Sequence, residues 1–580
     1  MSRSEEVVNI ASALSEMAKS RPYAMAVACP AGRDREGRAA YTHWTFQQLD
    51  RESDLLARGL TEIGVGRGVR TVLMVRPGLE FFAITFALFK AGAVPVLIDP
   101  GMGIKNLGRC LEQAKPYAFI GIRRAQLARK LFGWARRTVR VTVTSDCSSA
   151  MWPYVDRLPG EYGDGENLKL SLTDVKFAAS NDDSFPIAAT RSDDLAAILF
   201  TSGSTGPPKG VEYSHGIFAA QVQMLRDLYK IERGEIDLCT FPLFALFAPA
   251  LGMTSVVPEM DATRPAHVDP VKIIDAIESF GATNMFGSPA LLRRVGEYGA
   301  EKGLTLPSLR RVISAGAPVP ARVLERFATM LSPGVQIFTP YGATESLPVA
   351  SIGSDEILNE TRHATDQGSG VCVGRPVAGM RVAIIKITED SIPTWSDNLT
   401  VPEGIVGEIV VQGPVVTRRY FDSPESTSRA KIRGIILPSR TSEDASVIHR
   451  MGDLGYRDPH GRIWFCGRKS HRVTTSAGTL YTIPCEAVFN THPKVNRTAL
   501  IGLGPDGMQR PVLCIEPNRW PVSRVERDEI VSGLKTIGRV YDHTKLIDTF
   551  LFHKSFPVDI RHNAKIFREK LAVWASRRVR

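Results

Sequence analysis

The sequence has few cysteines, and none of them are arranged to bind a metal. Eight cysteines are scattered over 580 residues, with no Cys-x-x-Cys pair and no His/Cys cluster at the spacing of a zinc site. Disulfide-dependent secreted domains and zinc-binding modules have denser, regularly spaced cysteines. We therefore expect a reduced, cytoplasmic setting and no structural zinc.

A membrane segment is also lacking. The first 22 residues contain acids early and no apolar core, which is not the pattern of a signal peptide. Residues 238–258 carry no charge, but Pro242 and Pro249 interrupt them. Proline removes a backbone hydrogen bond that lipid cannot replace. We expect this stretch to line an apolar acyl tunnel, and we expect no transmembrane segment.

No nucleic-acid motif accompanies the net charge of +11, so we expect no nucleic-acid partner. The cations are widely spread except in residues 122–141, which contain seven arginines or lysines and no acid. A helix there would place Leu127, Leu131 and Trp134 on one face. We expect that face to pack on the domain. The alternative is a peripheral contact with a membrane surface or an acidic partner.

A loop rich in glycine and hydroxyl residues is the most informative stretch that is present. Residues 199–211 read LFTSGSTGPPKGV and overlap the apolar run 195–200, which predicts a buried strand. Glycine N–H groups, hydroxyls and a lysine together bind phosphate. The loop is not a Walker A loop, because Pro208 and Gly210 stand where that motif needs Gly and Ser or Thr. A flexible linker would seldom follow a buried strand. The sequence thus predicts a phosphate-binding loop.

The order of the surrounding elements predicts a mainly parallel sheet covered by helices. Thr45 is expected to cap the first of these helices. The expected helices are residues 44–65, 79–91, 215–229, 271–280 and 321–330, and the expected strands are 69–75, 93–98, 195–200, 282–287, 309–314 and 335–338. Residues 145–192 are expected to form a polar surface excursion, and residues 401–421 an antiparallel segment.

Six motifs follow one another in a fixed order: FTSGSTGPPKG, YGATE, GEIVVQGP, GDLGYRD, GRK and a near-terminal lysine, Lys565. Together they resemble the AMP-forming adenylating superfamily, which includes acyl-CoA synthetases, luciferases and peptide-synthetase adenylation domains. The resemblance implies an α/β fold with a large N-terminal domain of helix-covered sheets, residues 1–468. A smaller, mobile C-terminal α+β domain would follow, residues 469–580.

The resemblance also implies a site for ATP, Mg²⁺ and a carboxylic acid. The implied catalytic residues are Lys209, Thr344, Glu345 and Lys565, with Glu345 also binding Mg²⁺. The implied nucleotide-binding residues are Thr201, Ser202, Gly203, Ser204, Thr205, Gly206, Gly316, Ala317, Pro318, Tyr341, Gly342, Asp453 and Arg468. Asp453 would accept hydrogen bonds from the ribose hydroxyls, and Lys565 would bridge the substrate carboxylate and the nucleotide. The alternative for Asp453 is an acid in a surface turn, and the alternative for Lys565 is a solvated lysine.

At three positions the sequence departs from the motifs that are common in this superfamily, and these departures indicate a particular subgroup. Ser470 replaces the usual acidic or lysine hinge, Ala245 stands where many acyl-CoA synthetases have histidine, and Asn563-Ala564-Lys565 replaces Ser-Gly-Lys. These features resemble the β-lactone synthetases of bacterial long-chain olefin biosynthesis. That resemblance implies a 2-alkyl-3-hydroxy fatty acid substrate, a β-lactone product formed without CoA, and other olefin-pathway enzymes as partners.

Three rival functions are consistent with the same motifs. They are a long-chain acyl-CoA ligase, an acyl-AMP ligase that feeds a carrier protein, and a non-catalytic adenylate-binding protein. The intact Lys209, Glu345, Asp453 and Lys565 argue against the third. A general base for lactone closure could be His215 or His562, although a structural role is the simpler interpretation of each.

Overall fold

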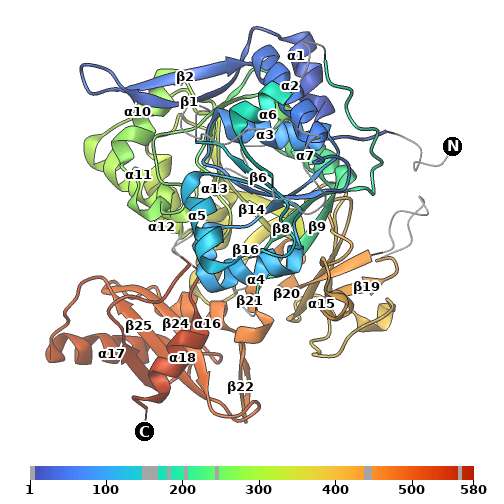
Figure 1. Ribbon diagram of the computed structural model, residues 1–580. Helices are drawn as coiled ribbons and strands as arrows, with labels where there is room; N and C mark the ends of the chain where they lie inside the picture. The colour runs from blue at the N-terminus through green and yellow to red at the C-terminus, as the bar shows by residue number, and fades with distance from the viewer. Residues whose placement is uncertain are drawn as a thin grey trace.

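The computed structural model describes residues 7–146, 168–178, 184–201, 207–241, 247–436, 447–559 and 565–579. Two large sheets and a smaller C-terminal sheet make up the fold, with helices packed against them (Figure 1). The predicted α/β class is confirmed.

The first sheet contains the strand that leads into the phosphate loop. Its seven strands lie in the order β7 (Leu168–Ser171), β6 (Val141–Thr144), β5 (Ala118–Gly121), β3 (Arg70–Met74), β4 (Val94–Leu97), β8 (Leu195–Phe200) and β9 (Gly210–Ser214). All pairs are parallel except β8 with β9. Short, wholly apolar strands such as β4 and β5 are buried throughout, as expected for a parallel sheet covered on both faces.

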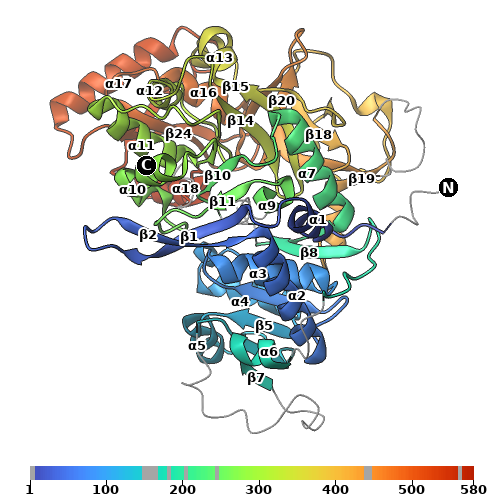
Figure 2. The ribbon, with the colours of Figure 1, turned by 90° about the horizontal axis from the view of Figure 1, so that it is seen from above.

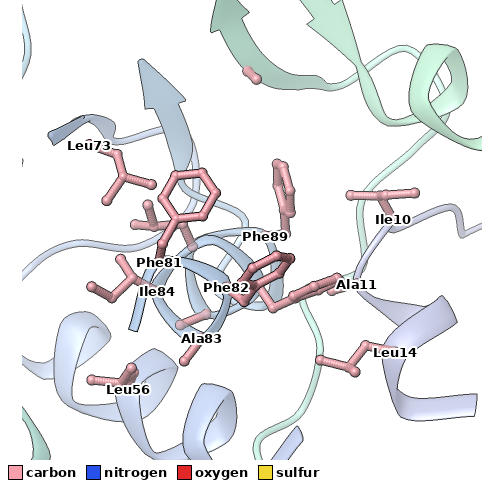
Figure 3. Packing of buried hydrophobic residues seen from close by; sticks show 14 of the residues in the cluster. Ile10, Ala11, Leu14, Leu56, Leu73, Phe81, Phe82, Ala83, Ile84 and Phe89 are labelled. Atoms are coloured by element: carbon pink, nitrogen blue, oxygen red, sulfur yellow. The ribbon is translucent and has the colours of Figure 1, made fainter. Parts of the chain in front are cut away.

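The helices between these strands form the core. Thr45 caps α2 (Phe46–Glu62) as predicted, because its side chain accepts from the N–H of Gln48 and the Gln48 side chain accepts from the N–H of Thr45. Helix α3 (Leu79–Lys90) is apolar all round and buried. Figure 3 shows Phe81, Phe82 and Ile84 of α3 in one cluster with Leu56 of α2 and Leu14 of α1 (Ser12–Ser20).

The second sheet changes from parallel to antiparallel along its width. Its main path runs β17 (Arg381–Ile385), β18 (Gly407–Gln412), β20 (Val447–Arg457), β21 (Ile463–Arg468), β16 (Val371–Pro376), β15 (Ser346–Gly353), β14 (Gln336–Ala343), β13 (Arg311–Ile313), β12 (Asn284–Phe286), β10 (Ile236–Cys239), β11 (Thr254–Val256), β1 (Met25–Arg33) and β2 (Ala39–Thr45), and β19 (Lys431–Arg433) pairs with β20. Along this path the pairs from β14 to β1 are parallel, while the pairs from β17 to β14 and the edge pair of β1 with β2 are antiparallel. The predicted antiparallel segment 401–421 is confirmed by β18.

The helices predicted at residues 215–229, 271–280 and 321–330 are confirmed as α7 (His215–Tyr229), α10 (Pro270–Phe280) and α12 (Ala321–Ala328). The structure also has helices that were not predicted, which are α9 (Phe247–Leu251), α11 (Pro289–Lys302), α13 (Ser354–Glu356), α14 (Arg362–Asp366) and α15 (Pro424–Ala430). Helices α10, α11 and α12 lie together on one side of the molecule (Figure 1).

A small C-terminal unit follows β21. It has the hairpin β22 (Val473–Thr475) and β23 (Gly478–Leu480), the sheet β24 (Val495–Leu503), β25 (Arg510–Pro517) and β26 (Thr549–Phe552), and the helices α16 (Thr482–Phe489), α17 (Arg524–Gly538) and α18 (Arg568–Ser576). Because β21 ends at Arg468, we propose the domain boundary between residues 468 and 469. In Figure 2 this unit lies at the opposite end of the molecule from β7.

Two predictions for the first sheet are wrong. Helix α5 (Arg123–Phe132) ends before Gly133, whose φ is +66°, so residue 134 leaves the helical register. Trp134 is therefore buried against α4 (Ile104–Ala114), while Leu127 and Leu131 are exposed. The expected excursion 145–192 contains β7, which extends the sheet at its edge, and α6 (Leu172–Ala178), which contacts α2. Residues 147–167 and 179–183 lie outside the described ranges.

The uncharged stretch 238–258 is part of the fold. It supplies the end of β10, then α9 and β11, whose residues are mostly buried, and residues 242–246 lie outside the described residues. Among the helices that the structure describes, none is both long and apolar enough to cross a bilayer.

Candidate active site

A cleft of about 1450 Å³ runs along the carboxyl ends of the first sheet and faces the second sheet. Its walls include eight of the predicted site residues: Thr201, Lys209, Gly316, Gly342, Thr344, Glu345, Arg468 and Lys565. The carboxyl ends of parallel strands are the usual place for a nucleotide or substrate.

Thr201 joins the two ends of the phosphate loop. Its backbone N–H donates to the carbonyl of Lys209 at 3.0 Å, and its hydroxyl accepts from the N–H of Lys209 at 3.2 Å. The ammonium group of Lys209 lies 5.0 Å from the ring centre of Tyr420. The remaining predicted loop residues, 202–206, lie outside the described ranges.

Glu345 is fixed on the cleft wall by a tyrosine distant in the sequence. The hydroxyl of Tyr420 donates to Glu345 Oε1 at 2.6 Å, and Glu345 lowers the tendency of that hydroxyl to ionise. Burial, followed by the charge of Glu345, raises the pKa of Tyr420 well above its ordinary value. Beside it, the hydroxyl of Tyr213 donates to the carbonyl of Thr344 at 2.5 Å.

A buried lysine lies behind this pair. Lys431 Nζ donates to the carbonyl and the hydroxyl of Thr417, whose N–H in turn donates to the carbonyl of Glu345 at 2.9 Å. Burial lowers the pKa of Lys431 to about 7, although the charge of Glu345 opposes the shift. The backbone of Glu345 is therefore held as firmly as its carboxylate.

Asp453, Tyr341 and Arg468 form a buried polar group beside the cleft. Tyr341 donates its hydroxyl to Asp453 Oδ2 at 2.7 Å, and Arg468 Nη1 lies 3.1 Å from Asp453 Oδ1. Burial raises the pKa of Asp453, and Arg468, Tyr341 and Lys565 act to lower it. Oδ1 accepts no hydrogen bond from the described residues. A buried carboxylate oxygen of this kind is suited to a hydroxyl donor from a ligand.

The expected base-binding segments meet the cleft only in part. Gly316 and Gly342 line it, whereas Ala317, Pro318 and Tyr341 are not among the lining residues. A Cβ on Gly342 would lie 2.6 Å from the carbonyl oxygen of Ser346, so only glycine allows this turn into β15. Tyr341 donates its hydroxyl to Asp453, and the role of its ring beside the base stays a prediction.

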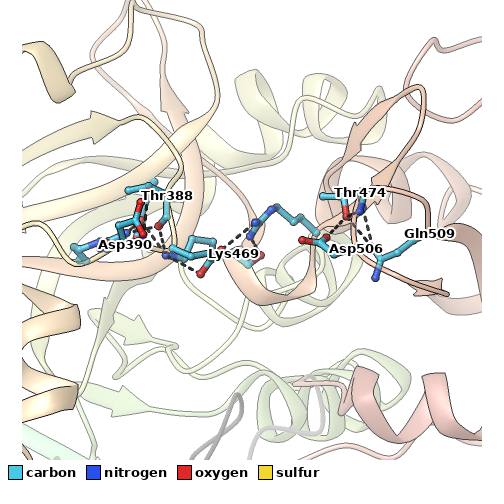
Figure 4. A network of polar contacts seen from close by, with 11 residues as sticks. Thr388, Asp390, Lys469, Thr474, Asp506 and Gln509 are labelled. Carbon is cyan, nitrogen blue, oxygen red and sulfur yellow. Dashed lines mark hydrogen bonds and ion pairs between the residues drawn. The ribbon is translucent and has the colours of Figure 1, made fainter.

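The C-terminal unit reaches the same cleft. Lys565 is among its lining residues, and its charge acts on the pKa of Asp453, which lies in the N-terminal part. The connection passes through Lys469, whose ammonium donates to the carbonyl of Thr388 at 2.9 Å and to Glu408 at 3.3 Å. Figure 4 shows this network reaching from Thr388 through Lys469 to Thr474 and its partners. The hinge residue Ser470 also lines the cleft.

Much of the remaining cleft wall is apolar, although charged residues such as Arg76, Glu259 and Asp261 also line it. Its phenylalanines are Phe81, Phe86, Phe89, Phe200, Phe218, Phe241, Phe247 and Phe286. The predicted pocket-lining role of residues 238–258 is confirmed by Phe241, Phe247 and Val257. Ala245 lies outside the described residues. A wall of this kind suits a long hydrocarbon chain.

His215 is not placed for proton transfer. It is fully buried at the start of α7, its Nδ1 accepts from the N–H of Ile10, and it is absent from the cleft wall. Burial lowers its pKa to about 4. The structural interpretation of His215 is supported, and His562 lies outside the described residues.

Sequence reasoning missed Tyr213, Tyr420 and Lys431. Tyr420 lies 75 positions from Glu345, and no spacing in the sequence relates the two. A signal was present, because Tyr420 lies near the end of the expected antiparallel segment 401–421, which contains GEIVVQGP.

Comparisons with known proteins agree with this geometry. The pattern of the family described as "AMP-binding enzyme" matches residues 14–421. The chain belongs to the AMP-binding enzyme family. It is 48% identical over 577 residues to an olefin beta-lactone synthetase of Xanthomonas campestris pv. campestris, covering 99% of this chain and 98% of the relative. It is also 48% identical over 570 residues to an olefin beta-lactone synthetase of Stenotrophomonas maltophilia, covering 98% of each chain.

The solved structures agree on the fold. A crystal structure of an anthranilate CoA ligase in complex with anthranoyl-AMP has a TM-score of 0.76, with 18% sequence identity, 100% coverage of this chain and 99% of the other. The predicted fold of an adenylate-forming enzyme is thereby confirmed.

Because the chain belongs to the AMP-binding enzyme family, we expect this cleft to bind a nucleotide. The residues of the cleft are suited to a nucleotide. Asp453 Oδ1 accepts no hydrogen bond from the described residues, Arg468 and Lys209 supply positive charge, and Thr201 opens the phosphate loop. Among the described residues, no three His, Cys, Asp or Glu side chains are grouped to hold a metal.

Proposed function

We propose that this AMP-binding enzyme is a β-lactone synthetase of long-chain olefin biosynthesis. It would convert a 2-alkyl-3-hydroxy fatty acid and ATP to a β-lactone, AMP and pyrophosphate. The observation behind this proposal is the 48% identity, over nearly the whole chain, to two olefin beta-lactone synthetases. The phenylalanine-lined wall beside Glu345 and Lys565 supports a long-chain acid.

In the first step the substrate carboxylate oxygen bonds to the α-phosphorus of ATP, and pyrophosphate leaves. Negative charge grows on the phosphoryl oxygens, so positive groups accelerate the step. Lys209 and Lys565 line the cleft and would supply that charge. Asp453 and Tyr341 would hold the ribose, since Asp453 Oδ1 is in an ion pair with Arg468 but accepts no hydrogen bond from the described residues.

Glu345 would bind Mg²⁺ together with the phosphates. Mg²⁺ usually takes one or two carboxylates plus phosphate oxygens and waters, and when bound it neutralises charge on the phosphates. Tyr420 fixes the Glu345 carboxylate at Oε1, and Thr417 fixes its backbone. Both contacts hold the carboxylate in place before any ligand binds.

In the second step the 3-hydroxyl oxygen bonds to the activated carbonyl carbon as the bond to AMP breaks, and the hydroxyl loses its proton. The nucleophile is part of the same substrate, so its effective concentration is high. The cleft must fold the chain back and keep water from the adenylate. The phenylalanines of its apolar wall would pack against the folded chain and would exclude water.

Product analysis tests the function. We expect incubation with ATP and a 2-alkyl-3-hydroxy acid to give one AMP and one lactone per turnover without CoA. Proton NMR identifies the lactone, and chromatography counts the AMP. If CoA is required and a thioester appears without any lactone, the protein is instead an acyl-CoA ligase.

Replacing Tyr420 by phenylalanine tests how Glu345 is held. The ring under Lys209 remains, but Glu345 loses a hydrogen bond of 2.6 Å. A hydrogen bond to a charged group contributes about 1.5–3 kcal/mol, which corresponds to a rate loss of about tenfold to a hundredfold. We expect AMP formation to need more Mg²⁺ for half-maximal rate.

Tyr229→Phe is the matched control, because its hydroxyl lies 3.3 Å from Ser351 and it does not line the cleft. Its magnesium dependence should equal that of the parent enzyme. Equal behaviour of the two variants would exclude a positioning role for Tyr420.

We further propose a cytoplasmic location and contact with the enzymes that make the hydroxy acid and consume the lactone. The seven described cysteines are all free and buried, which is consistent with a reducing compartment.

A further inference from the structure

Helix α5 presents large apolar side chains to solvent. Leu127 is 66% exposed, Leu131 is 75% exposed, and Phe132 at the helix end is 45% exposed. The structure thus overturns the expected packing of Leu127 and Leu131 on the domain. Three large apolar side chains exposed within six residues of one short helix need an explanation in an otherwise ordinary surface.

The cations of this segment surround the apolar side chains. Lys130, Arg136, Arg137 and Arg140 are exposed, and residues 122–141 contain no acid. The neighbouring helix α4 adds exposed Ile104, Lys105 and Arg109. The exposed acids of these two elements and their ends are Glu112 on α4 and Asp146, which accepts from the N–H of Arg123. The patch therefore combines an apolar centre with a strong excess of positive charge.

The inner side of the same helix lines the active-site cleft. Ala125 and Ala128 belong to its wall, together with Trp134 just after the helix. The cleft that contains Glu345 at one end thus extends beneath α5 at the other. A hydrocarbon chain that left the adenylation end along this cleft would arrive under the exposed patch.

We propose that α5 and the turn after it dock on the surface of an anionic phospholipid bilayer. Leu127, Leu131 and Phe132 would enter the headgroup–acyl boundary, and the surrounding arginines and Lys130 would contact lipid phosphates. The apolar end of the cleft then lies next to the lipid, where a long-chain hydroxy acid is concentrated. That last consequence rests on the proposed function, but membrane binding does not.

The patch fits a lipid surface better than an acidic protein. Exposed cations lie among the exposed apolar side chains, and residues 122–141 offer no acid that would fix the orientation of a partner. Figure 2 places α5 and β7 at the end of the molecule opposite α17, so the C-terminal unit does not cover the patch. Short helices of this type bind reversibly, and their binding depends on anionic lipid and on salt.

Vesicle flotation of the full chain, without nucleotide or substrate, tests the proposal. We expect the protein to float with vesicles of equal parts phosphatidylglycerol and phosphatidylcholine, and to remain below with phosphatidylcholine alone. Raising the salt concentration should release it. Failure to float with either vesicle overturns the proposal and leaves an acidic protein as the partner to seek. Equal flotation with both overturns it as well, since charge would then play no part.

Two variants assign the binding to this patch. Leu127→Ser/Leu131→Ser/Phe132→Ser removes the apolar centre, and Lys130→Gln/Arg136→Gln/Arg137→Gln removes charge. We expect each to lower the vesicle partition coefficient at least tenfold. The matched control, Met508→Ser/Val525→Ser/Val573→Ser, changes side chains that are 73%, 70% and 57% exposed in the C-terminal unit. Parental binding by both patch variants, or equal loss in the control, overturns the assignment to α5.

Activity measurements separate this proposal from the proposed function. With a short, water-soluble 3-hydroxy acid and no vesicles, the patch variants should release AMP at the parental rate, because no changed side chain is in the catalytic group. With a long-chain acid presented in anionic vesicles, their KM should rise at least tenfold with kcat unchanged. Flotation that succeeds in a protein that makes no lactone would leave the membrane proposal standing and overturn only the function.

Discussion

The rate of adenylate formation should fall by about a hundredfold to a thousandfold when Lys565 is replaced by alanine, while ATP still binds. Lys565 comes from the C-terminal unit and lines the cleft opposite residues of the N-terminal part. Its charge is expected to matter most when charge moves from the carboxylate to the leaving pyrophosphate. ATP should be retained because Thr201, Lys209, Asp453 and Arg468 lie outside that unit.

Pyrophosphate release measures the rate, and isothermal titration with ATP measures the affinity. Lys554→Ala is the control, because Lys554 is exposed in the same unit and does not line the cleft. It should behave as the parent enzyme. A Lys565→Ala variant that turns over within a few-fold of the parent would falsify the proposed role.

Local structure was predictable from the sequence where the residues of one short segment determine it. The capping box at Thr45 needs only Thr45 and Gln48, and it starts α2 as predicted. The apolar run before the phosphate loop forms β8, and the strands expected at 282–287, 309–314 and 335–338 form β12, β13 and β14. In each case a few neighbouring residues, a short apolar stretch or a cap, suffice to predict the element.

Contacts between distant segments were not predictable in this way. Tyr341 meets Asp453 across 112 positions, and Tyr420 meets Glu345 across 75. Such contacts depend on how β14, β20 and the segment after β18 are placed side by side, which no single segment contains. The base-slot role of Tyr341 stays a prediction, and the contact of its hydroxyl with Asp453 is what the sequence did not predict.

Helix α5 shows a second reason why a prediction from the sequence was wrong. A periodic pattern places Leu127, Leu131 and Trp134 on one face only if the helix continues to residue 134. The left-handed backbone at Gly133 ends it earlier, and a positive φ is far easier for glycine than for other residues. Trp134 then packs on α4 at Gly108, where a Cβ would lie 3.1 Å from the indole nitrogen. Because Gly133 ends the helix, Trp134 is buried while Leu127 and Leu131 are exposed.

Replacing Glu345 by glutamine should lower the rate of AMP formation by about a hundredfold or more, and the half-maximal rate should require more Mg²⁺. The substitution preserves shape, and the amide oxygen can still accept from Tyr420, so the loss reports the charge of the carboxylate. A neutral amide binds Mg²⁺ weakly, because a hard cation depends on carboxylate and phosphate charge.

The matched control for this change is Glu297→Gln, since Glu297 is 39% exposed in its side chain and pairs with Arg293 and Arg326 away from the cleft. AMP formation is measured over a series of Mg²⁺ concentrations at saturating ATP. A rate that recovers at high Mg²⁺ would assign Glu345 to metal binding, whereas a loss that Mg²⁺ cannot restore would assign it to positioning of the phosphates. An unchanged rate and an unchanged magnesium dependence would remove Glu345 from the site altogether, and with it the reason for the buried Tyr420 contact.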